Sequence, residues 1–176
     1  MNIVGVGNTL MGDDGVGVVA LERLAERGVP EGAQLHEAGL AVSDVLGRLD
    51  PDDPLIVLDG VEAGGPPGSV YKVHLDEASL EAAADERILS LHELSVVPAL
   101  RLEALSGRRF SDVMVFGVEP SRVAWGEGLS PPVSAAIERL VDAVAEHVET
   151  RRRPRRPVGE GAGYLPSPLG ETAGEV

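Results

Sequence analysis

The chain opens on a short apolar stretch that breaks into a glycine-rich loop and continues as a helical pattern. Residues 5–17 are Gly-Val-Gly-Asn-Thr-Leu-Met-Gly-Asp-Asp-Gly-Val-Gly, and apolar residues then recur at helical spacing as far as residue 27. A strand, a loop and a helix in this order are typical of α/β domains. The loop places two adjacent carboxylates, Asp13 and Asp14, at the carboxyl end of the strand, where α/β proteins gather their binding sites.

The hydrophobic pattern of the remaining sequence predicts the same α/β class over most of the chain. Strand-like apolar runs alternate with segments of helical periodicity, which predicts a three-layer domain. We expect a twisted, mostly parallel sheet of about five strands with helices on both faces. Pro98 must lie in the first turn of its helix or break that helix. Strands are predicted at residues 1–6, 34–37, 55–59, 69–75 and 112–117, and helices at 16–27, 42–49, 94–105 and 133–148.

The composition changes near residue 150, which suggests two regions. Residues 1–150 form the expected α/β domain. Residues 151–176 are rich in Pro, Gly, Glu and Arg and lack apolar periodicity, so we predict a disordered tail that adds nothing to the core. Five of the chain's 15 basic residues lie at 151–156, and the domain itself is therefore more acidic than the net charge of −14 indicates.

Several classes of protein are excluded by composition. The chain has no cysteine, which removes disulfide scaffolds, thiolate metal sites and cysteine nucleophiles. It has no apolar run long enough to span a bilayer and no basic segment before its apolar start. The acidic domain repels phosphates and favours cations. We therefore expect a cytoplasmic monomer that binds neither nucleic acid nor membrane.

The glycine loop does not fit the nucleotide-binding motifs. A dinucleotide fingerprint that starts at Gly5 needs a glycine at position 10, which is Leu10. A phosphate loop that ends at Gly12 needs Lys and then Ser or Thr, and Asp13 follows instead. Two carboxylates would also repel a triphosphate, so nucleotide binding is disfavoured.

Asp13 and Asp14 have two possible roles. Aspartate is a preferred residue at helix N-termini, where its carboxylate caps free backbone N–H groups. One cap needs only one acid, so the second carboxylate is expected to point toward the crevice at the ends of the strands. Capping and ligand binding both remain open from this segment alone.

Asp59 and His92 are the other candidate site residues. Asp59 ends the buried run at residues 55–58, where a charge is costly unless it is paired or binds a cation, although a simple turn also explains it. His92 precedes a helix on a loop that can reach the same edge, although a structural role is also open. His36 is ambiguous, and His74 and His147 are expected at the surface.

Two carboxylates and one imidazole on three loops suit a divalent metal with open coordination positions. This donor set is compatible with nickel, zinc, manganese or iron and does not choose among them. The chain lacks the second histidine of a zincin motif, since position 96 is Val96, and it lacks the Gly-x-Ser-x-Gly elbow of serine hydrolases.

With these residues, the sequence resembles the hydrogenase maturation protease family over about residues 1–148. The opening Gly-Val-Gly-Asn-Thr-Leu-Met-Gly-Asp-Asp-Gly-Val-Gly is similar to the family signature, and it is followed in order by Ala38-Gly39, the segment 55–68, and Phe116-Gly117-Val118-Glu119-Pro120 with Gly128-Leu129-Ser130-Pro131. The resemblance implies Asp14, Asp59 and His92 as metal ligands, with Asp14 and Asp59 also catalytic. Asp13 replaces Asp14 if the register shifts by one, and Gly39 matches a position linked to substrate handling.

The resemblance also implies an activity. Members of the family are nickel-dependent endopeptidases that remove a C-terminal peptide from the large-subunit precursor of [NiFe] hydrogenases. Nickel is expected to arrive in the substrate as a recognition element, and other divalent metals to substitute for it. Hydrolysis by a metal-activated group and hydrolysis with a carboxylate as general base, as in aspartic-type chemistry, both remain open. The alternative function is a non-catalytic nickel-binding chaperone that inspects the precursor.

Overall fold

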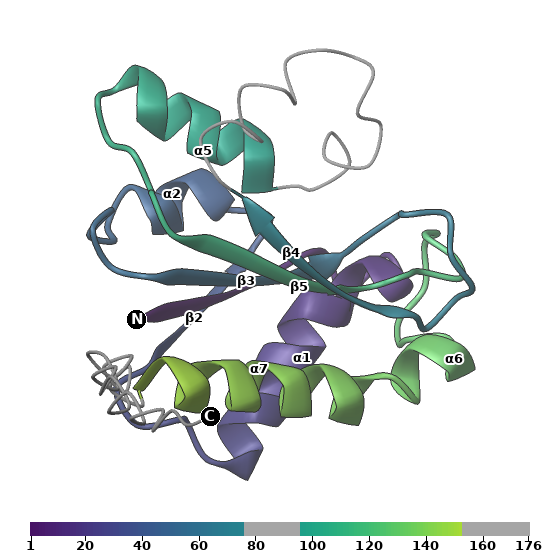
Figure 1. Cartoon of the computed structure of the whole chain (residues 1–176). Coiled ribbons are helices and arrows are strands. Elements are labelled where there is room, and N and C mark those ends of the chain that lie inside the picture. Colours follow the sequence, from purple (N-terminus) through teal and green to yellow (C-terminus); the bar gives the residue numbers. More distant parts are fainter. Residues whose placement is uncertain (76–95, 153–176) are drawn as a thin grey trace, which may run out of the picture.

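A five-stranded sheet with helices on both faces forms the protein (Figure 1). The structure is a computed structural model that describes residues 1–75 and 96–152. The strand order is β2-β1-β3-β5-β4, in which only the β4–β5 pairing is antiparallel. The predicted α/β class and mostly parallel sheet are confirmed. The strands are β1 (Asn2–Val6), β2 (Gln34–Gly39), β3 (Leu55–Gly60), β4 (Val70–Leu75) and β5 (Val113–Val118).

Two layers of helices cover the two faces of the sheet (Figure 1). Helices α2 (Val42–Leu46) and α5 (Val96–Leu105) pack on one face, and α1 (Val16–Arg27) and α7 (Ile137–Arg152) pack on the other. Neighbouring residues of a strand point to opposite faces, so Val57 contacts the α2–α5 layer while Leu58 contacts the α1–α7 layer. This alternation divides the apolar core into two clusters.

The start of α1 lies directly against the ends of β1 and β3. A Cβ atom on Gly17 would come within 2.1 Å of the Leu58 carbonyl oxygen and 2.4 Å of the Val6 carbonyl oxygen. Only glycine leaves room for such an approach. The helix therefore begins at the carboxyl edge of the sheet, and the short 3-10 turn η1 (Asp13–Gly15) that precedes it lies at this edge as well.

The C-terminal helical pattern differs from the prediction in two ways. The single helix expected at residues 133–148 is divided into α6 (Pro131–Ser134) and α7 by a turn at residues 135–136. The predicted tail boundary at residue 150 also falls within α7, which continues to Arg152 and pairs the Arg151 guanidinium with the Asp112 carboxylate. Residues 153–176 of that tail lie outside the described residues.

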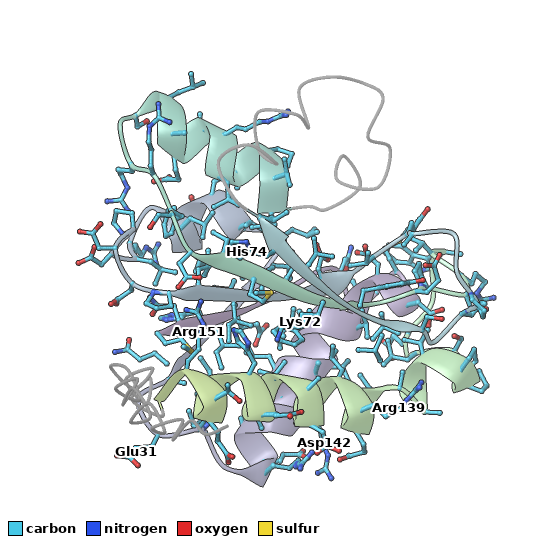
Figure 2. The ribbon with its side chains drawn as sticks, in the orientation of Figure 1. Glu31, Lys72, His74, Arg139, Asp142 and Arg151 are labelled. Atoms are coloured by element: carbon cyan, nitrogen blue, oxygen red, sulfur yellow. The ribbon has the colours of Figure 1, made fainter. Side chains whose placement is uncertain are left out.

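Polar contacts hold α7 against its neighbours. Arg27 of α1 pairs with Asp142 at 2.7 Å, and Figure 2 shows Asp142 on the side of α7 that faces away from the sheet. Arg139 donates a hydrogen bond of 2.8 Å to the Gly68 carbonyl oxygen in the loop between β3 and β4. Within residues 1–75 and 96–152, no helix combines the length and the apolar character that crossing a bilayer requires.

Candidate active site

Asp14 and Asp59 both lie at the carboxyl edge of the sheet. Asp59 is the fifth residue of β3, and Asp14 belongs to the turn between β1 and α1. The two strands are parallel neighbours, paired as far as Gly5 and Leu58. A Cβ on Gly7 would come within 1.8 Å of the Asp14 carbonyl oxygen, so this turn folds back onto the end of β1. The carboxyl ends of adjacent parallel strands are the usual location of sites in such folds.

A cavity of about 310 Å³ opens beside Asp14. Asp14 is half-buried, and its Oδ2 accepts a hydrogen bond of 2.8 Å from the Asn8 backbone N–H. Most of the cavity wall is apolar and comes from the end of β2, from α2 and from α5. Its lining residues are Val6, Gly7, Asp14, Gly39, Leu40, Val42, Ser43, Pro98, Ala99 and Leu102.

Asp59 lies on the same face of the sheet as this cavity. It follows Leu55 and Val57 at the two-residue spacing that directs side chains to the α2–α5 layer. Its side chain is 3% exposed, and its Oδ1 accepts a hydrogen bond of 2.8 Å from the Gly60 backbone N–H. A carboxylate buried at the carboxyl edge of the sheet is suited to binding a cation or to a proton-transfer role.

Asp13 holds a loop and does not cap a helix. Its carboxylate is 1% exposed and accepts hydrogen bonds from the backbone N–H groups of Ser121, Arg122 and Ser130 and from the Ser130 hydroxyl, at 2.6–2.9 Å. Helix α1 begins at Val16, and no side chain caps its N-terminus at Gly15. The capping interpretation of the acid pair is therefore wrong. Asp13 instead ties the segment between β5 and α6 to the loop that carries Asp14.

These contacts control the charge of Asp13. Burial raises the pKa of its carboxyl group, but the hydrogen bonds from Ser130, Arg122 and Ser121 outweigh burial and hold that pKa below its ordinary value. Asp13 is therefore an ionised anchor with its acceptor positions in use. Asp14 accepts a hydrogen bond from the Asn8 N–H and borders the cavity, so it is the acid of the pair that a substrate can reach.

Glu119 is a further buried carboxylate at the end of a strand, and its motif alone did not indicate its role. It is 7% exposed and accepts hydrogen bonds from Ala63 N–H, Gly64 N–H and the Tyr71 hydroxyl. Burial raises the pKa of Glu119, but the hydrogen bond from Tyr71 and those from the loop amides lower it overall. Glu119 thus fixes the loop that follows Asp59. Its position directly after an apolar strand is the sequence signal for this role.

Three of the four histidines lie in the part of the chain that the structure describes. His92 lies outside the described residues. His36 is tied by its Nε2 to the Asn2 side chain at 3.0 Å, and burial lowers its pKa. His74 is exposed, as predicted. His147 is not a surface residue: it is half-buried, and its ring packs edge-on against Phe116 with 5.4 Å between ring centroids.

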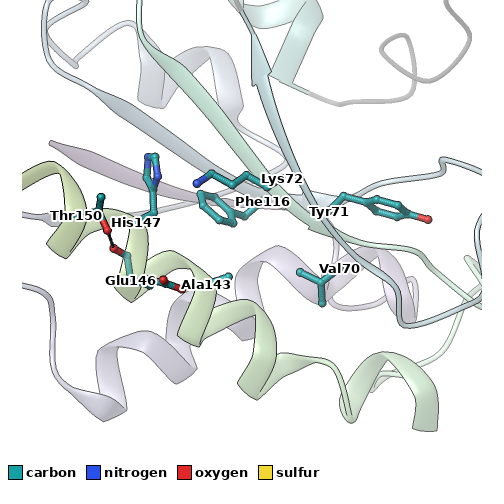
Figure 3. Close-up of a pocket in the computed structure, with 8 residues that line it drawn as sticks. All are labelled: Val70, Tyr71, Lys72, Phe116, Ala143, Glu146, His147 and Thr150. Carbon is teal, nitrogen blue, oxygen red and sulfur yellow. Dashed lines mark hydrogen bonds between the residues drawn. The ribbon is translucent and has the colours of Figure 1, made fainter.

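A larger cavity of about 470 Å³ lies elsewhere, between β4 and α7 (Figure 3). His147 borders it together with Lys72, whose ammonium group lies 5.4 Å from the centre of the Phe116 ring. Burial lowers the pKa of His147, and the nearby charges of Lys72 and Arg151 lower it further. Of the predicted site residues that the structure describes, neither Asp14 nor Asp59 borders this cavity, so size alone does not identify the site.

The described residues supply part of the predicted metal-binding set. Asp14 and Asp59 provide hard oxygen donors at one edge of the sheet. Across residues 1–75 and 96–152, no three His, Asp or Glu side chains form a cluster that could hold a metal ion. Chemically, the two carboxylates can ligate a cation brought to the edge or accept a proton from water.

This fold and site define an α/β protein with a pair of acids at the carboxyl edge of its sheet, next to an apolar cavity. Residues 18–147 match the hydrogenase maturation protease family, and the chain belongs to that family. The matched range includes Asp59 and His92 and begins just after Asp14.

Similar proteins agree with this assignment. The hydrogenase expression/formation protein HoxM of Azotobacter vinelandii is 32% identical over 151 residues, which cover 85% of this chain and 72% of that protein. The hydrogenase 2 maturation protease of Escherichia coli is 28% identical over 81% of this chain and 86% of its own length. Among solved structures, the hydrogenase maturating endopeptidase HybD from E. coli superimposes with a TM-score of 0.71 at 26% identity, over 86% of this chain and 93% of HybD. The chain therefore belongs to a family of endopeptidases that act in hydrogenase maturation.

Proposed function

We propose that this protein removes the C-terminal peptide from a nickel-loaded [NiFe] hydrogenase large-subunit precursor. The observation that carries the proposal is the placement of Asp14 and Asp59 at the ends of two adjacent parallel strands, on the side of the sheet where the 310 Å³ cavity opens. The cavity wall is mostly apolar, and Asp14 is the charged residue among those that line it. Such a wall suits an extended peptide whose cleavage point lies at the acids.

Nickel is part of the substrate in this proposal. Asp14 and Asp59 offer oxygen donors to the metal, and His92 is the proposed nitrogen donor. His92 lies four positions before Val96 in the sequence, and α5, which starts at Val96, lines the cavity through Pro98, Ala99 and Leu102. A precursor without metal then lacks the group that anchors its cleavage site, so the protease discriminates by a difference in affinity. Other divalent metals of similar size and donor preference are expected to substitute for nickel.

Two hydrolytic routes remain compatible with these residues. In the first, the precursor's nickel polarises the scissile carbonyl or an attacking water, and the two carboxylates hold the nickel in position. In the second, Asp14 or Asp59 accepts the proton of the attacking water as a general base. The net negative charge of the chain is compatible with both routes, because it attracts cations such as the precursor's metal.

The decisive experiment is incubation of the protein with nickel-loaded and nickel-free precursor, followed by measurement of the large subunit's mass. We expect loss of one C-terminal peptide in the nickel-loaded sample only. Tight binding without any change of mass would instead support the nickel-binding chaperone. Cleavage of both samples at equal rates would contradict nickel as a recognition element.

Matched variants test the proposed residues. His92→Ala should abolish processing without a large fall in melting temperature, whereas His74→Ala, on an exposed position of β4, should process normally. Normal cleavage by His92→Ala would remove His92 from the proposed site, and a large fall in its melting temperature would mean that His92 is structural.

We also expect the protein to act as a monomer in the cytoplasm, which sedimentation and cell fractionation would check.

A further inference from the structure

Three large apolar side chains are exposed next to the candidate site. Leu10 is 44% exposed, Val123 is 47% exposed and Trp125 is 78% exposed. Trp125 is the chain's only tryptophan, in a protein whose aromatic residues make up just 3% of the sequence. We call these three residues the apolar ridge. The segment that carries Val123 and Trp125 joins β5 to α6 at the same end of the sheet as the β3–β4 loop (Figure 1).

Backbone contacts connect the two segments of the ridge. The Gly126 N–H donates to the Leu10 carbonyl oxygen at 2.9 Å, and the Gly12 N–H donates to the Gly126 carbonyl oxygen at 2.9 Å. Isolated bridges pair Met11 with Gly126 and Gly12 with Val123. Leu10 and Trp125 therefore belong to one small paired unit.

Asp13 fixes this unit to the site. Its buried carboxylate accepts the backbone N–H groups of Ser121 and Arg122, just before Val123, and that of Ser130, on the far side of Trp125. The next residue in the chain is Asp14, which borders the cavity. A buried carboxylate with this many partners makes a rigid connection, so the ridge and Asp14 keep a fixed relation to each other.

The properties of the ridge are those of a preorganised protein-binding surface. Tryptophan is enriched among the residues that dominate binding energy at protein interfaces. A surface that is already ordered loses little conformational entropy on binding. Its continuity with the Asp14 loop identifies the partner, because any protein processed at Asp14 must lie against this edge of the sheet.

We propose that the apolar ridge is the docking surface for the folded body of the large-subunit precursor, whose C-terminal peptide enters the cavity beside Asp14. This inference rests on the proposed function. It adds that affinity for the precursor depends on an apolar contact outside the cavity and does not come from the metal alone.

Kinetics on the nickel-loaded precursor provide the first test. Trp125→Ala should raise KM by roughly 10- to 30-fold, with kcat within about twofold and the melting temperature unchanged. Trp125→Phe should restore most of the affinity. Leu105→Ala is the matched control, since Leu105 is an exposed apolar residue at the end of α5, and it should leave both constants unchanged. An unchanged KM for Trp125→Ala would overturn the proposal.

A spectroscopic test reports the ridge directly. Incorporation of 5-fluorotryptophan yields a single ¹⁹F signal, because Trp125 is the only tryptophan. In an Asp59→Asn background, which is expected to bind without cutting, addition of nickel-loaded precursor should shift and broaden that signal. A signal that does not move with bound precursor would overturn the proposal, as would a shift that depends only on the protein's own concentration and so indicates self-association.

These outcomes separate the two proposals. If the wild-type protein leaves the precursor at full length, the proposed function fails while the ¹⁹F shift still decides whether the ridge binds the precursor. If the wild-type protein cuts the precursor and Trp125→Ala cuts it with the same KM, only the docking surface fails.

Discussion

Asp13 and Asp14 are adjacent and chemically identical, yet they differ in what surrounds them. Asp13 is enclosed by backbone N–H groups from the segment at residues 121–130, whereas Asp14 is half-buried at the cavity. The direction of a side chain in a tight 3-10 turn changes strongly from one residue to the next. One acid of the pair therefore became a structural anchor and the other a candidate site residue.

The first prediction separates these two roles by substitution. Asp13→Asn should lower the free energy of unfolding by about 2–4 kcal/mol. The reason is that the amide NH2 group would face backbone N–H groups that donate hydrogen bonds to the carboxylate in the wild type. Asp14→Asn should lower it by less than about 1 kcal/mol, since its amide oxygen can still accept the Asn8 N–H, yet it should abolish processing. Urea unfolding and the precursor mass assay measure the two effects. Equal loss of stability in both variants would refute the assignment.

The second prediction concerns pH. The pKa of Asp13 is lower in the folded protein than in the unfolded chain, so its ionised form stabilises the fold above the unfolded value of about 3.9. That contribution is lost as pH falls through the lower folded pKa. The difference in unfolding free energy between the wild type and Asp13→Asn should therefore narrow as the pH falls below the unfolded value of about 3.9. A gap that stays constant over this range would contradict an ionised Asp13.

At the scale of elements, the position of α1 decides where the site lies. The helix starts on top of the carbonyl groups of Val6 and Leu58, so the turn that carries Asp14 is held at the ends of β1 and β3. Glu119 performs a similar task for the loop after β3, which it binds through Ala63 and Gly64. Short contacts between elements thus bring acids from separate segments to one edge.

The third prediction tests the close packing of the start of α1 against the sheet. Gly17→Ala should cost about 3 kcal/mol or more, because its Cβ would overlap two backbone carbonyl oxygens that belong to the sheet. Gly60→Ala is the control, since the nearest atom to its Cβ would be 4.0 Å away, and it should change stability by less than about 1 kcal/mol. Thermal unfolding of the two variants provides the comparison. Similar melting temperatures would mean that α1 shifts without cost.

At the scale of the whole molecule, the C-terminal end of α7 is joined to the sheet by an ion pair. Arg151 lies in the last turn of α7 and forms two hydrogen bonds to the Asp112 carboxylate, which precedes β5. The charge change near residue 150 is therefore not the end of the packed structure. A truncation designed from composition alone would remove an ion pair that joins α7 to the sheet.

The fourth prediction follows from this ion pair. Deletion of residues 153–176 should leave processing and the melting temperature unchanged, to within about 2 °C. Deletion of residues 151–176 should also leave processing intact but lower stability by up to about 1 kcal/mol, because the partly exposed Arg151–Asp112 pair is lost. Calorimetry and the mass assay distinguish the two truncations. Loss of activity in the shorter deletion would assign a role to residues 153–176.

Periodicity determined most of the architecture without any tertiary information. The apolar runs at residues 55–59 and 112–117 and the helical spacing at residues 16–27 each became the expected element, because burial on one or two faces requires those periods. The break between α6 and α7 was not visible in the pattern, since the residues around Ala135 continue the same apolar spacing on both sides. Local turns of this kind depend on packing against neighbouring segments.

The sequence by itself determined the fold class and the candidate acids, because hydrophobic spacing and the strand-to-loop transitions are local properties of the chain. It could not decide which of Asp13 and Asp14 reaches the cavity, nor that Glu119 holds a loop or that Trp125 faces solvent beside the site. Those outcomes depend on hydrogen bonds between residues more than 40 positions apart, and only the folded chain brings such residues together.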